Sequence, residues 1–475
     1  MPLMKIIPIV VLVFFSSCQL KDVLNPNVTD VSFIGTTQSS QVWLNGMQRQ
    51  LAQTLNQTIS FTEIVSDNYY NNSSLSNKVF DIPTILYSDL DVDNMQRAIG
   101  RLSEMAEYGI SQIIPADAGT TPDIKSEIYF IGGFANLLKG EINHSVVLTA
   151  NGEIVPAAES FKKAINYFTI ALQTQTVAAK KNFYTLALAR AYYNLGDKTN
   201  AVNLATTIRS GDPLLLLNAV FDGVNGVSNT MQTYTFSSST NTYAPLPRLD
   251  FLDPKYYHIG NAATDQKPIA ILKGEEAYLI LAEAAIGRND VSGAKLIMKE
   301  LISQVISKRP TAQVNGSIAQ RKGNRSDYPL LATVKVKFDA ASPERSGFIL
   351  DRQAGNITVY RVSGTSVTAT NIDAASGSDD LLYLLCQMRQ EIFMSEGRRM
   401  TDLGIRFPVS QVEMQNNPNV KPEHTLALIP SYIPNQLGLD DFVYDRAAGV
   451  VTMKYDMNKV LVQNKTASGV LPMLK

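Results

Sequence analysis

Cysteine, histidine and tryptophan are scarce in this chain, and their scarcity limits the chemistry it can support. The 475 residues include two cysteines, three histidines and one tryptophan. Two cysteines cannot build a disulfide framework. The histidines, His144, His258 and His424, lie far apart, and none belongs to a metal-ligand spacing such as H-E-x-x-H. The sequence therefore gives no reason to expect a disulfide-stabilised scaffold or a histidine metal centre.

Signatures of nucleotide binding and of hydrolase chemistry are also absent. The chain has no Walker loop, no G-x-G-x-x-G and no G-x-S-x-G. Pairs of carboxylates occur by chance in a chain with 43 acidic residues, so they do not indicate a glycosidase. We expect no enzymatic activity, no cofactor and no metal.

A strong charge of either sign is missing too. Lysine and arginine number 42 against 43 aspartate and glutamate residues, which gives a formal net charge of -1. This balance provides no electrostatic reason to expect a nucleic acid partner.

The N-terminus has the pattern of a secretory signal peptide. Lys5 precedes an apolar run at residues 6–15, and the small residues Ser16 and Ser17 follow it. The run is too short to span a bilayer as a helix. Residues 1–17 are therefore predicted to be a cleaved signal.

The small residues of this signal end on Cys18, and the pattern resembles a bacterial lipobox in which Phe15 replaces the usual leucine. The resemblance implies that Cys18 is lipidated, and several acyl chains anchor a protein firmly to a membrane. Gln19 follows in place of the aspartate that commonly retains lipoproteins at the inner membrane. We expect a lipidated tether at 18–37, a single domain at 38–475, and anchoring at the cell surface in the outer membrane of a Gram-negative bacterium. The alternative is a plain cleaved signal with an incidental cysteine.

Apolar residues recur at helical spacing over most of the first half of the chain. The predicted helices cover residues 41–64, 93–113, 124–142, 157–174, 178–195 and 198–209. Trp43 lies beside the apolar stripe of the first helix. We expect it to pack against a neighbouring helix, with a ligand-facing role as the alternative.

Two stretches have the layout of a tetratricopeptide hairpin. In residues 181–208 small residues let two helices approach closely, and Gly196-Asp197 marks the turn; these small residues are Ala187, Ala189, Ala191, Ala201 and Ala205. The layout returns at 274–305, where alanines line both helices around the turn at 288–290. Such hairpins cannot bury their apolar faces singly, so stacked hairpins are predicted.

The segment 379–407 combines an apolar stripe with a dense set of charges. Its apolar residues Leu381, Leu385, Met388 and Ile392 recur three and four residues apart, which predicts a helix with one buried face. Cys386 lies in this stripe and is expected to be a small buried hydrophobe.

The charges at the end of this segment are spaced as pairs along a helix: Glu396 with Arg399, and both Arg398 and Arg399 with Asp402. Gly397 inside a helix costs up to about 1 kcal/mol relative to alanine. We therefore expect close approach of another backbone, with the arginines holding loops. A salt-bridged surface helix is the alternative.

The end of this segment resembles the C-terminal signature of the SusD/RagB family. The matching residues are Arg389, Glu396, Gly397, Arg399, Asp402 and Leu403. Glutamates that are common in the family are replaced here by Met388 and Ile392, and the usual basic-aromatic ending is altered at 404–406. The second hairpin carries the other hallmark, a Glu-x-Tyr-Leu-Ile followed by Ala-Glu-Ala, at Glu276, Tyr278, Leu279, Ile280, Ala282, Glu283 and Ala284.

The resemblance spans nearly the whole chain and implies a divergent SusD-like member. It implies an all-α, mainly α-helical fold of stacked tetratricopeptide-like hairpins under a large layer of irregular loops. It also implies a nutrient-binding lipoprotein that captures glycan oligosaccharides and delivers them to a SusC-like TonB-dependent transporter. A peptide-binding member of the family and a tetratricopeptide scaffold that binds no ligand stay open as alternatives.

Loops are expected to hold the ligand, because long irregular stretches occur at 211–272 and 310–375. The polar stretch 66–77 places Tyr69, Tyr70, Asn71 and Asn72 together, and exposed rings flanked by amides suit a sugar or a peptide. We predict these four residues as ligand-binding, with Tyr243, Tyr256 and Tyr257 as further candidate rings. The tail from Asn416 onward is expected to wrap the surface with little regular structure.

Overall fold

The computed structural model describes residues 33–72, 78–236, 242–258, 260–318, 327–434 and 439–475. The predicted signal peptide 1–17, the predicted lipidation site Cys18 and most of the predicted tether 18–37 lie outside the described residues.

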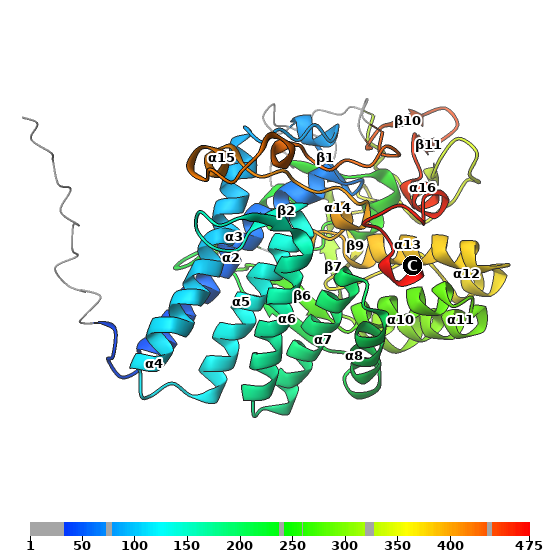
Figure 1. Ribbon diagram of the computed structural model, residues 1–475. Helices are drawn as coiled ribbons and strands as arrows, with labels where there is room; N and C mark the ends of the chain where they lie inside the picture. Colours follow the sequence, from blue (N-terminus) through cyan, green and yellow to red (C-terminus); the bar gives the residue numbers. More distant parts are fainter. Residues whose placement is uncertain (1–32, 73–77, 237–241, 259, 319–326, 435–438) are drawn as a thin grey trace, which may run out of the picture.

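Paired helices stand side by side in the N-terminal half, and all six of the helices predicted there are present. Figure 1 shows them as a row that runs from blue through cyan to green. They are α2 (Ser39–Val65), α3 (Leu90–Tyr108), α5 (Pro122–Ile142), α6 (Ala157–Thr174), α7 (Ala178–Leu195) and α8 (Lys198–Gly211). A π-helical turn, Gly109–Ile113, extends α3 and leads into the short helix α4 (Ile114–Ala116).

The first predicted hairpin is formed by α7 and α8. Gly196 ends α7 with a φ of 74°, a left-handed backbone that favours glycine. The Asp197 side chain then caps α8 by accepting a hydrogen bond from the Asn200 N–H. Ala187 and Ala201 are fully buried, so the small residues predicted to let the helices approach do lie in the core.

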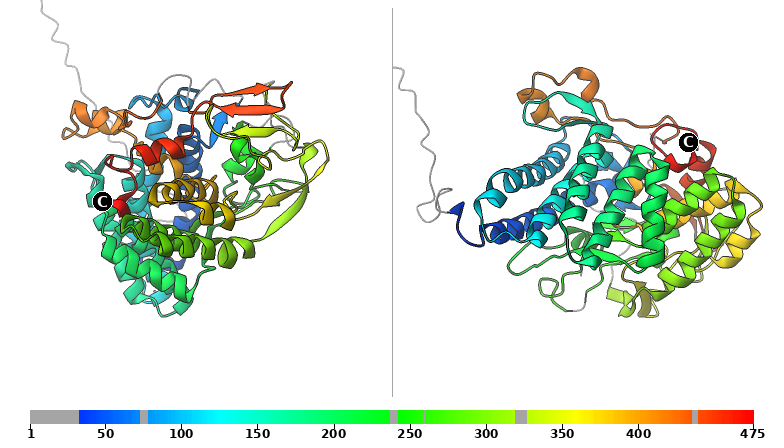
Figure 2. Two further views of the ribbon diagram at one scale, coloured as in Figure 1. Left: turned by 90° about the vertical axis from the view of Figure 1, so that its right-hand side faces the viewer. Right: turned by 60° about the horizontal axis from the view of Figure 1, so that its bottom comes forward.

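The second hairpin consists of α10 (Glu275–Gly287) and α11 (Val291–Glu300). The Asp290 carboxylate accepts from the Gly293 N–H at 2.8 Å and caps the return helix. The two views of Figure 2 place this hairpin beside α8 and α13 (Ser378–Ile392), so the stack continues into the C-terminal half. The predicted helical fold with tetratricopeptide-like hairpins is confirmed.

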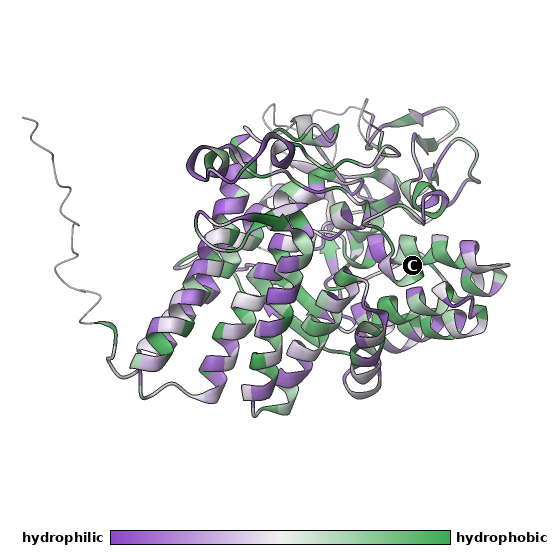
Figure 3. Ribbon diagram, viewed as in Figure 1, coloured by the Kyte–Doolittle hydropathy of each residue, from purple (hydrophilic) through white to green (hydrophobic). Residues whose placement is uncertain are grey.

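Packing of amphipathic faces holds the stack together. Figure 3 shows apolar and polar residues alternating around helices such as α3 and α6, as expected for helices that bury one face. One contiguous cluster of buried residues extends from Leu44 in α2 to Met473 near the end of the chain. None of the helices in the described residues is long and apolar enough to cross a membrane.

Short strands and short helices lie beside the hairpins. The strands are β1 (Tyr69–Asn71), β2 (Ser145–Val147), β3 (Ile154–Pro156), β4 (Leu216–Ala219), β5 (Tyr243–Pro245), β6 (Ile269–Lys273), β7 (Thr311–Asn315), β8 (Lys335–Lys337), β9 (Asn356–Tyr360), β10 (Phe442–Asp445) and β11 (Val450–Met453). They pair as β1 with β5, β2 with β3, β4 with β6 and β7 with β9, and β11 lies between β10 and β8. The short helices are α9 (Thr230–Thr235), α12 (Ala369–Ala374), α14 (Arg399–Asp402), α15 (Gln411–Asn416) and α16 (Met457–Gln463).

The stretches expected to be irregular are therefore more ordered than predicted. Residues 211–272 and 310–375 contribute six of these strands, and the tail beyond Asn416 forms β10, β11 and α16. β11 pairs in parallel with β8, which lies more than a hundred residues earlier in the chain. Such pairings are set by partners distant in sequence, so the local composition does not reveal them.

The prediction of one helix over 379–407 is wrong. Helix α13 ends at Ile392, and α14 begins at Arg399. Gly397 lies between them with a φ of 73°, a backbone conformation that a helix cannot contain. The expected close approach is present: a Cβ at Gly397 would lie 2.9 Å from Thr62 Oγ1 and 3.3 Å from Ile59 Cα of α2.

Candidate functional site

The charges predicted to pair along one helix instead reach separate parts of the molecule. Arg389 on α13 binds Asp402 on α14 through two hydrogen bonds, Nη2 to Oδ1 at 2.7 Å and Nε to Oδ2 at 3.2 Å. Its guanidinium also lies 5.2 Å from the ring centre of Tyr193 on α7. This bidentate pair joins the two helices on either side of Gly397.

Arg399 and Arg398 extend in different directions. Arg399 donates to both carboxylate oxygens of Asp67, which follows α2, at 2.5 and 3.0 Å. Arg398 donates to Glu276 on α10 at 2.7 Å. Burial alone would raise the pKa of Asp67, but the charge and hydrogen bonds of Arg399 together with the charge of Arg248 outweigh it and lower this pKa below its usual value. The two arginines thus connect α14 to the first helix and to the second hairpin.

The glutamates of the family pattern are buried and bonded as well. Glu396 accepts from Lys273 Nζ at 2.7 Å and also pairs with Lys255. Glu283 accepts from the Tyr193 hydroxyl at 2.8 Å and from the Met473 N–H at 3.0 Å. Burial raises the pKa of Glu283 above its usual value.

The predicted ligand-binding residues lie in the core. Tyr69, Tyr70, Asn71 and Asn72 are 0%, 3%, 4% and 3% exposed, so the prediction that they are displayed on a loop is wrong. The physical reason is the pairing of β1 with β5, which covers this stretch. The Tyr69 hydroxyl donates to Asp253 Oδ1 at 2.9 Å inside the protein.

The other candidate rings are also buried. Tyr243, Tyr256 and Tyr257 are each 2% exposed. The Tyr256 hydroxyl donates to the Ser395 carbonyl at 2.9 Å. Trp43 packs as expected, because its Nε1–H donates to the Met105 carbonyl at 2.9 Å and its ring lies 5.2 Å from that of Tyr108.

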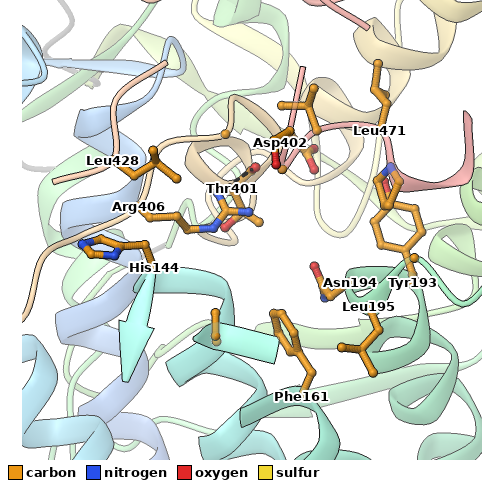
Figure 4. A pocket seen from close by; sticks show the side chains of 18 of the residues that line it. His144, Phe161, Tyr193, Asn194, Leu195, Thr401, Asp402, Arg406, Leu428 and Leu471 are labelled. Carbon is orange, nitrogen blue, oxygen red and sulfur yellow. Dashed lines mark hydrogen bonds between the residues drawn. The ribbon is translucent and has the colours of Figure 1, made fainter. Parts of the chain in front are cut away.

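A cavity of about 640 Å³ lies beside the ion-pair network (Figure 4). Helices α5, α6 and α7, the residues of and after α14, and the last residues of the chain form its walls. The volume is in the range of sites for small molecules. None of its lining residues comes from 211–272 or 310–375, the stretches expected to hold a ligand.

Aromatic and polar side chains face each other across this cavity. Figure 4 shows Phe161 of α6 pointing in from one side and Arg406 from the other, with Asn194 between α7 and the open space. Phe161 packs directly on Gly140, where a Cβ would lie 2.7 Å from the ring. The Asn194 amide donates to Glu141 Oε1 at 2.8 Å, which fixes its orientation.

The cavity is also lined by His144. Its Nε2–H donates to the Leu426 carbonyl at 2.7 Å, and its Nδ1 lies 2.8 Å from the Ser145 hydroxyl oxygen. Burial lowers the pKa of His144 below its usual value. Among the residues that the structure describes, no group of three or more His, Cys, Asp and Glu side chains could hold a metal ion.

The surroundings also shift the pKa values of a buried thiol and a buried carboxyl group near the cavity. Burial raises the pKa of the Cys386 thiol to about 12, and this effect exceeds the lowering by the charges of Arg399 and Arg389. Burial alone would raise the pKa of Glu141, but Arg190 and Arg398 lower it to about 2. The aromatic, amide and guanidinium groups that line the cavity are of the kinds that can hold a ligand.

Fold and site together define an α-helical protein of stacked hairpins with a partly polar cavity near its C-terminal segment. Solved structures share this fold. A SusD superfamily protein from Bacteroides fragilis matches with a TM-score of 0.55 and 13% identity over 82% of this chain and 100% of that one. A SusD superfamily protein from Bacteroides vulgatus matches with a TM-score of 0.54 and 12% identity over 82% and 98%.

A SusD-like carbohydrate binding protein from Bacteroides vulgatus also matches, with a TM-score of 0.51 and 14% identity over 78% of this chain and 83% of that one. The chain therefore has the SusD-like fold. No family model matches the sequence, and no curated protein matches it significantly.

Most of the cavity carries no signal in the sequence. Arg406 stands out there only as a departure from the family ending, and Phe161, Asn194 and His144 belong to no motif that indicates a site. They come from separate segments, so only the folded chain brings them together. The spacing of small residues in α7, by contrast, did locate the helix that forms one wall.

Proposed function

We propose that this protein is a divergent SusD/RagB-type lipoprotein that captures glycan oligosaccharides at the cell surface and passes them to a TonB-dependent transporter. The observation that carries the proposal is the SusD-like fold over most of the chain, which a solved carbohydrate binding protein shares. The order of the two family motifs along the sequence supports it independently.

The cavity is the proposed cargo site. A ring such as Phe161 can stack on the apolar face of a sugar, and such a contact contributes about 0.5–1.5 kcal/mol. The neighbouring Asn194 and Arg406 supply polar groups that can orient hydroxyls. The stiff helical stack behind the cavity provides a broad surface for docking on a transporter.

Calorimetry with neutral, acidic and peptide ligands tests the binding claim. We expect the protein without its signal peptide to bind at least one class of oligosaccharide with saturable heat. Heat from peptides alone would support the peptide-binding alternative. The absence of heat from every probe would refute cargo binding and favour the scaffold.

A matched pair of variants tests where the cargo binds. Ala158, near the start of α6, lines the cavity, whereas Ala178 at the start of α7 does not. We expect Ala158→Trp to fill the cavity and weaken binding about ten-fold or more, and Ala178→Trp to leave it unchanged. Equal affinity of the two variants for the oligosaccharide would show that the cargo does not bind in this cavity.

Lipid anchoring and the transporter partnership are tested in cells. In the proposed function, Cys18→Ala releases the protein from the outer membrane fraction, while the native chain stays there and incorporates labelled palmitate. The native chain is expected to co-purify with a TonB-dependent barrel. A Cys18→Ala variant that stays in the membrane fraction would contradict the proposed anchor.

A further inference from the structure

Arg406 lines the cavity but does not belong to the network of ion pairs described above. Its Nη1 donates to two backbone carbonyls, those of Thr401 at 3.1 Å and Ile405 at 2.8 Å. Within the described residues, Nε and Nη2 make no hydrogen bond and no carboxylate pairs with the guanidinium. Figure 4 shows this side chain reaching between His144 and Thr401 toward the open space.

The neighbouring arginines are different, because each has its own carboxylate. Arg190 binds Glu141 through two hydrogen bonds at 2.7 and 2.5 Å. Arg389 does the same with Asp402. Glu141 and Asp402, whose charges act on Arg406, are therefore already bonded to other arginines, and neither forms a hydrogen bond with its guanidinium.

The charge balance of the cavity walls points the same way. Of the three arginines that line the cavity, Arg389 is paired with Asp402 and Arg399 with Asp67, so Arg406 is the one with no carboxylate partner among the described residues. Burial lowers the pKa of Arg406 below its usual value, which reflects the cost of a partly desolvated charge. An incoming anion would relieve that cost.

The geometry points to a specific class of cargo. We propose that the cavity binds an acidic saccharide, one that carries a carboxylate or a sulfate ester, and that Arg406 is the residue that binds the anionic group. The inference rests on the proposed function, since it specifies the cargo of the same cavity. A planar guanidinium with Nε and Nη2 available can bind two oxygens of one anion side by side.

Features of the cavity beyond Arg406 favour a sugar ring over a free inorganic ion. A volume of about 640 Å³ is far larger than a single anion needs. Phe161 stands across from Arg406 and can cover the ring that carries the anionic group.

Titration of the protein with a galacturonate trisaccharide, a galactose trisaccharide and a sulfated galactose trisaccharide tests the inference. We expect at least one acidic trisaccharide to bind ten-fold or more tightly than the neutral one, with an affinity that falls as salt is raised. The better acidic ligand identifies the anionic group. Equal affinities for the three would overturn the inference and leave the proposed function intact.

Variants assign the preference to Arg406. Arg406→Gln is expected to weaken the acidic ligand about ten-fold or more and to weaken the neutral one by clearly less, because the hydrogen bond lost from the acidic ligand is one to a charged group. Arg361→Gln is the matched control: Arg361 is also half-buried and bonds to a backbone carbonyl, that of Tyr257, but it does not line the cavity. An acidic preference that survives in Arg406→Gln would contradict the assignment.

A second pair of variants uses an exposed position, where substitutions are expected to change the stability of the fold little. Ser468 is exposed and lines the cavity. Ser468→Glu is expected to weaken the acidic ligand through like-charge repulsion, and Ser468→Lys is expected not to weaken it. The same affinity in both variants would refute binding of the anion in this cavity.

Inorganic sulfate separates this inference from the proposed function. If no trisaccharide binds but sulfate raises the melting temperature of the native protein and not of Arg406→Gln, the anion site stands and glycan capture fails. If neither sulfate nor any trisaccharide binds, both are overturned.

Discussion

Replacing Gly397 by alanine tests the account of how the C-terminal motif is packed. The substitution forces a left-handed backbone on alanine, since φ is 73° at this position, which costs about 1–2 kcal/mol. The new Cβ would also lie 2.9 Å from Thr62 Oγ1 and 3.3 Å from Ile59 Cα, and the latter is a backbone atom that cannot rotate away. Overpacking of this kind costs about 1–3 kcal/mol, so the total loss is about 2–5 kcal/mol.

Gly449 provides the matched control, because its φ is 65° and a Cβ there meets nothing within 4 Å. Gly449→Ala should cost only the backbone strain of about 1–2 kcal/mol. Urea unfolding monitored by circular dichroism gives both free energies, and Gly397→Ala is expected to lose about 1–3 kcal/mol more than the control. Equal losses would show that α2 does not press on this turn and would refute the reasoning.

Three further predictions concern buried groups. Arg399→Met leaves Asp67 buried without its partner and should lower the free energy of unfolding in urea by about 3–5 kcal/mol. Lys465→Met breaks an exposed ion pair and should lower it by under about 1 kcal/mol. Equal losses in the two variants would contradict a stabilising buried pair. Burial raises the pKa of Glu63 to about 7 from 4.5, so the folded chain holds a proton that the unfolded chain has lost. The free energy of unfolding, measured relative to Glu63→Gln, should therefore fall as pH rises from about 5 to about 8, and a constant difference would refute this. A thiol reagent at pH 8 should modify Cys386 only after unfolding, and rapid labelling of the native protein would contradict its burial.

The helices could be predicted because their signals are local. Apolar spacing and small residues located α7 and α8, and the turn residues Gly196 and Asp197 located the end of one helix and the start of the next. Each of these features acts within a few residues, so a single sequence is enough to show them.

In the segment around Gly397, local spacing does not predict the structure. The charges do recur at helical spacing in the sequence. The backbone around Gly397 is instead set by the close approach of α2 and by the hydrogen bonds of Arg399 to Asp67. The prediction that Tyr69 is exposed is wrong for a related reason. Its polar surroundings suggested exposure, whereas its partner Asp253 lies 184 residues away in the chain.

Most of the cavity could not be predicted. Its residues come from helices in both halves of the chain, and no short motif relates Phe161 to Arg406. A site assembled from separate segments leaves no periodic trace in the sequence, so only the fold reveals it.

The central claim is that cargo binds between the helical hairpins and the C-terminal segment, and a crystal structure of the protein with a bound oligosaccharide tests it most directly. The account predicts a saccharide in the cavity, with a sugar ring against Phe161 and a polar or anionic group on Arg406. A saccharide bound instead on the segments 211–272 or 310–375, with this cavity holding only water, would contradict it.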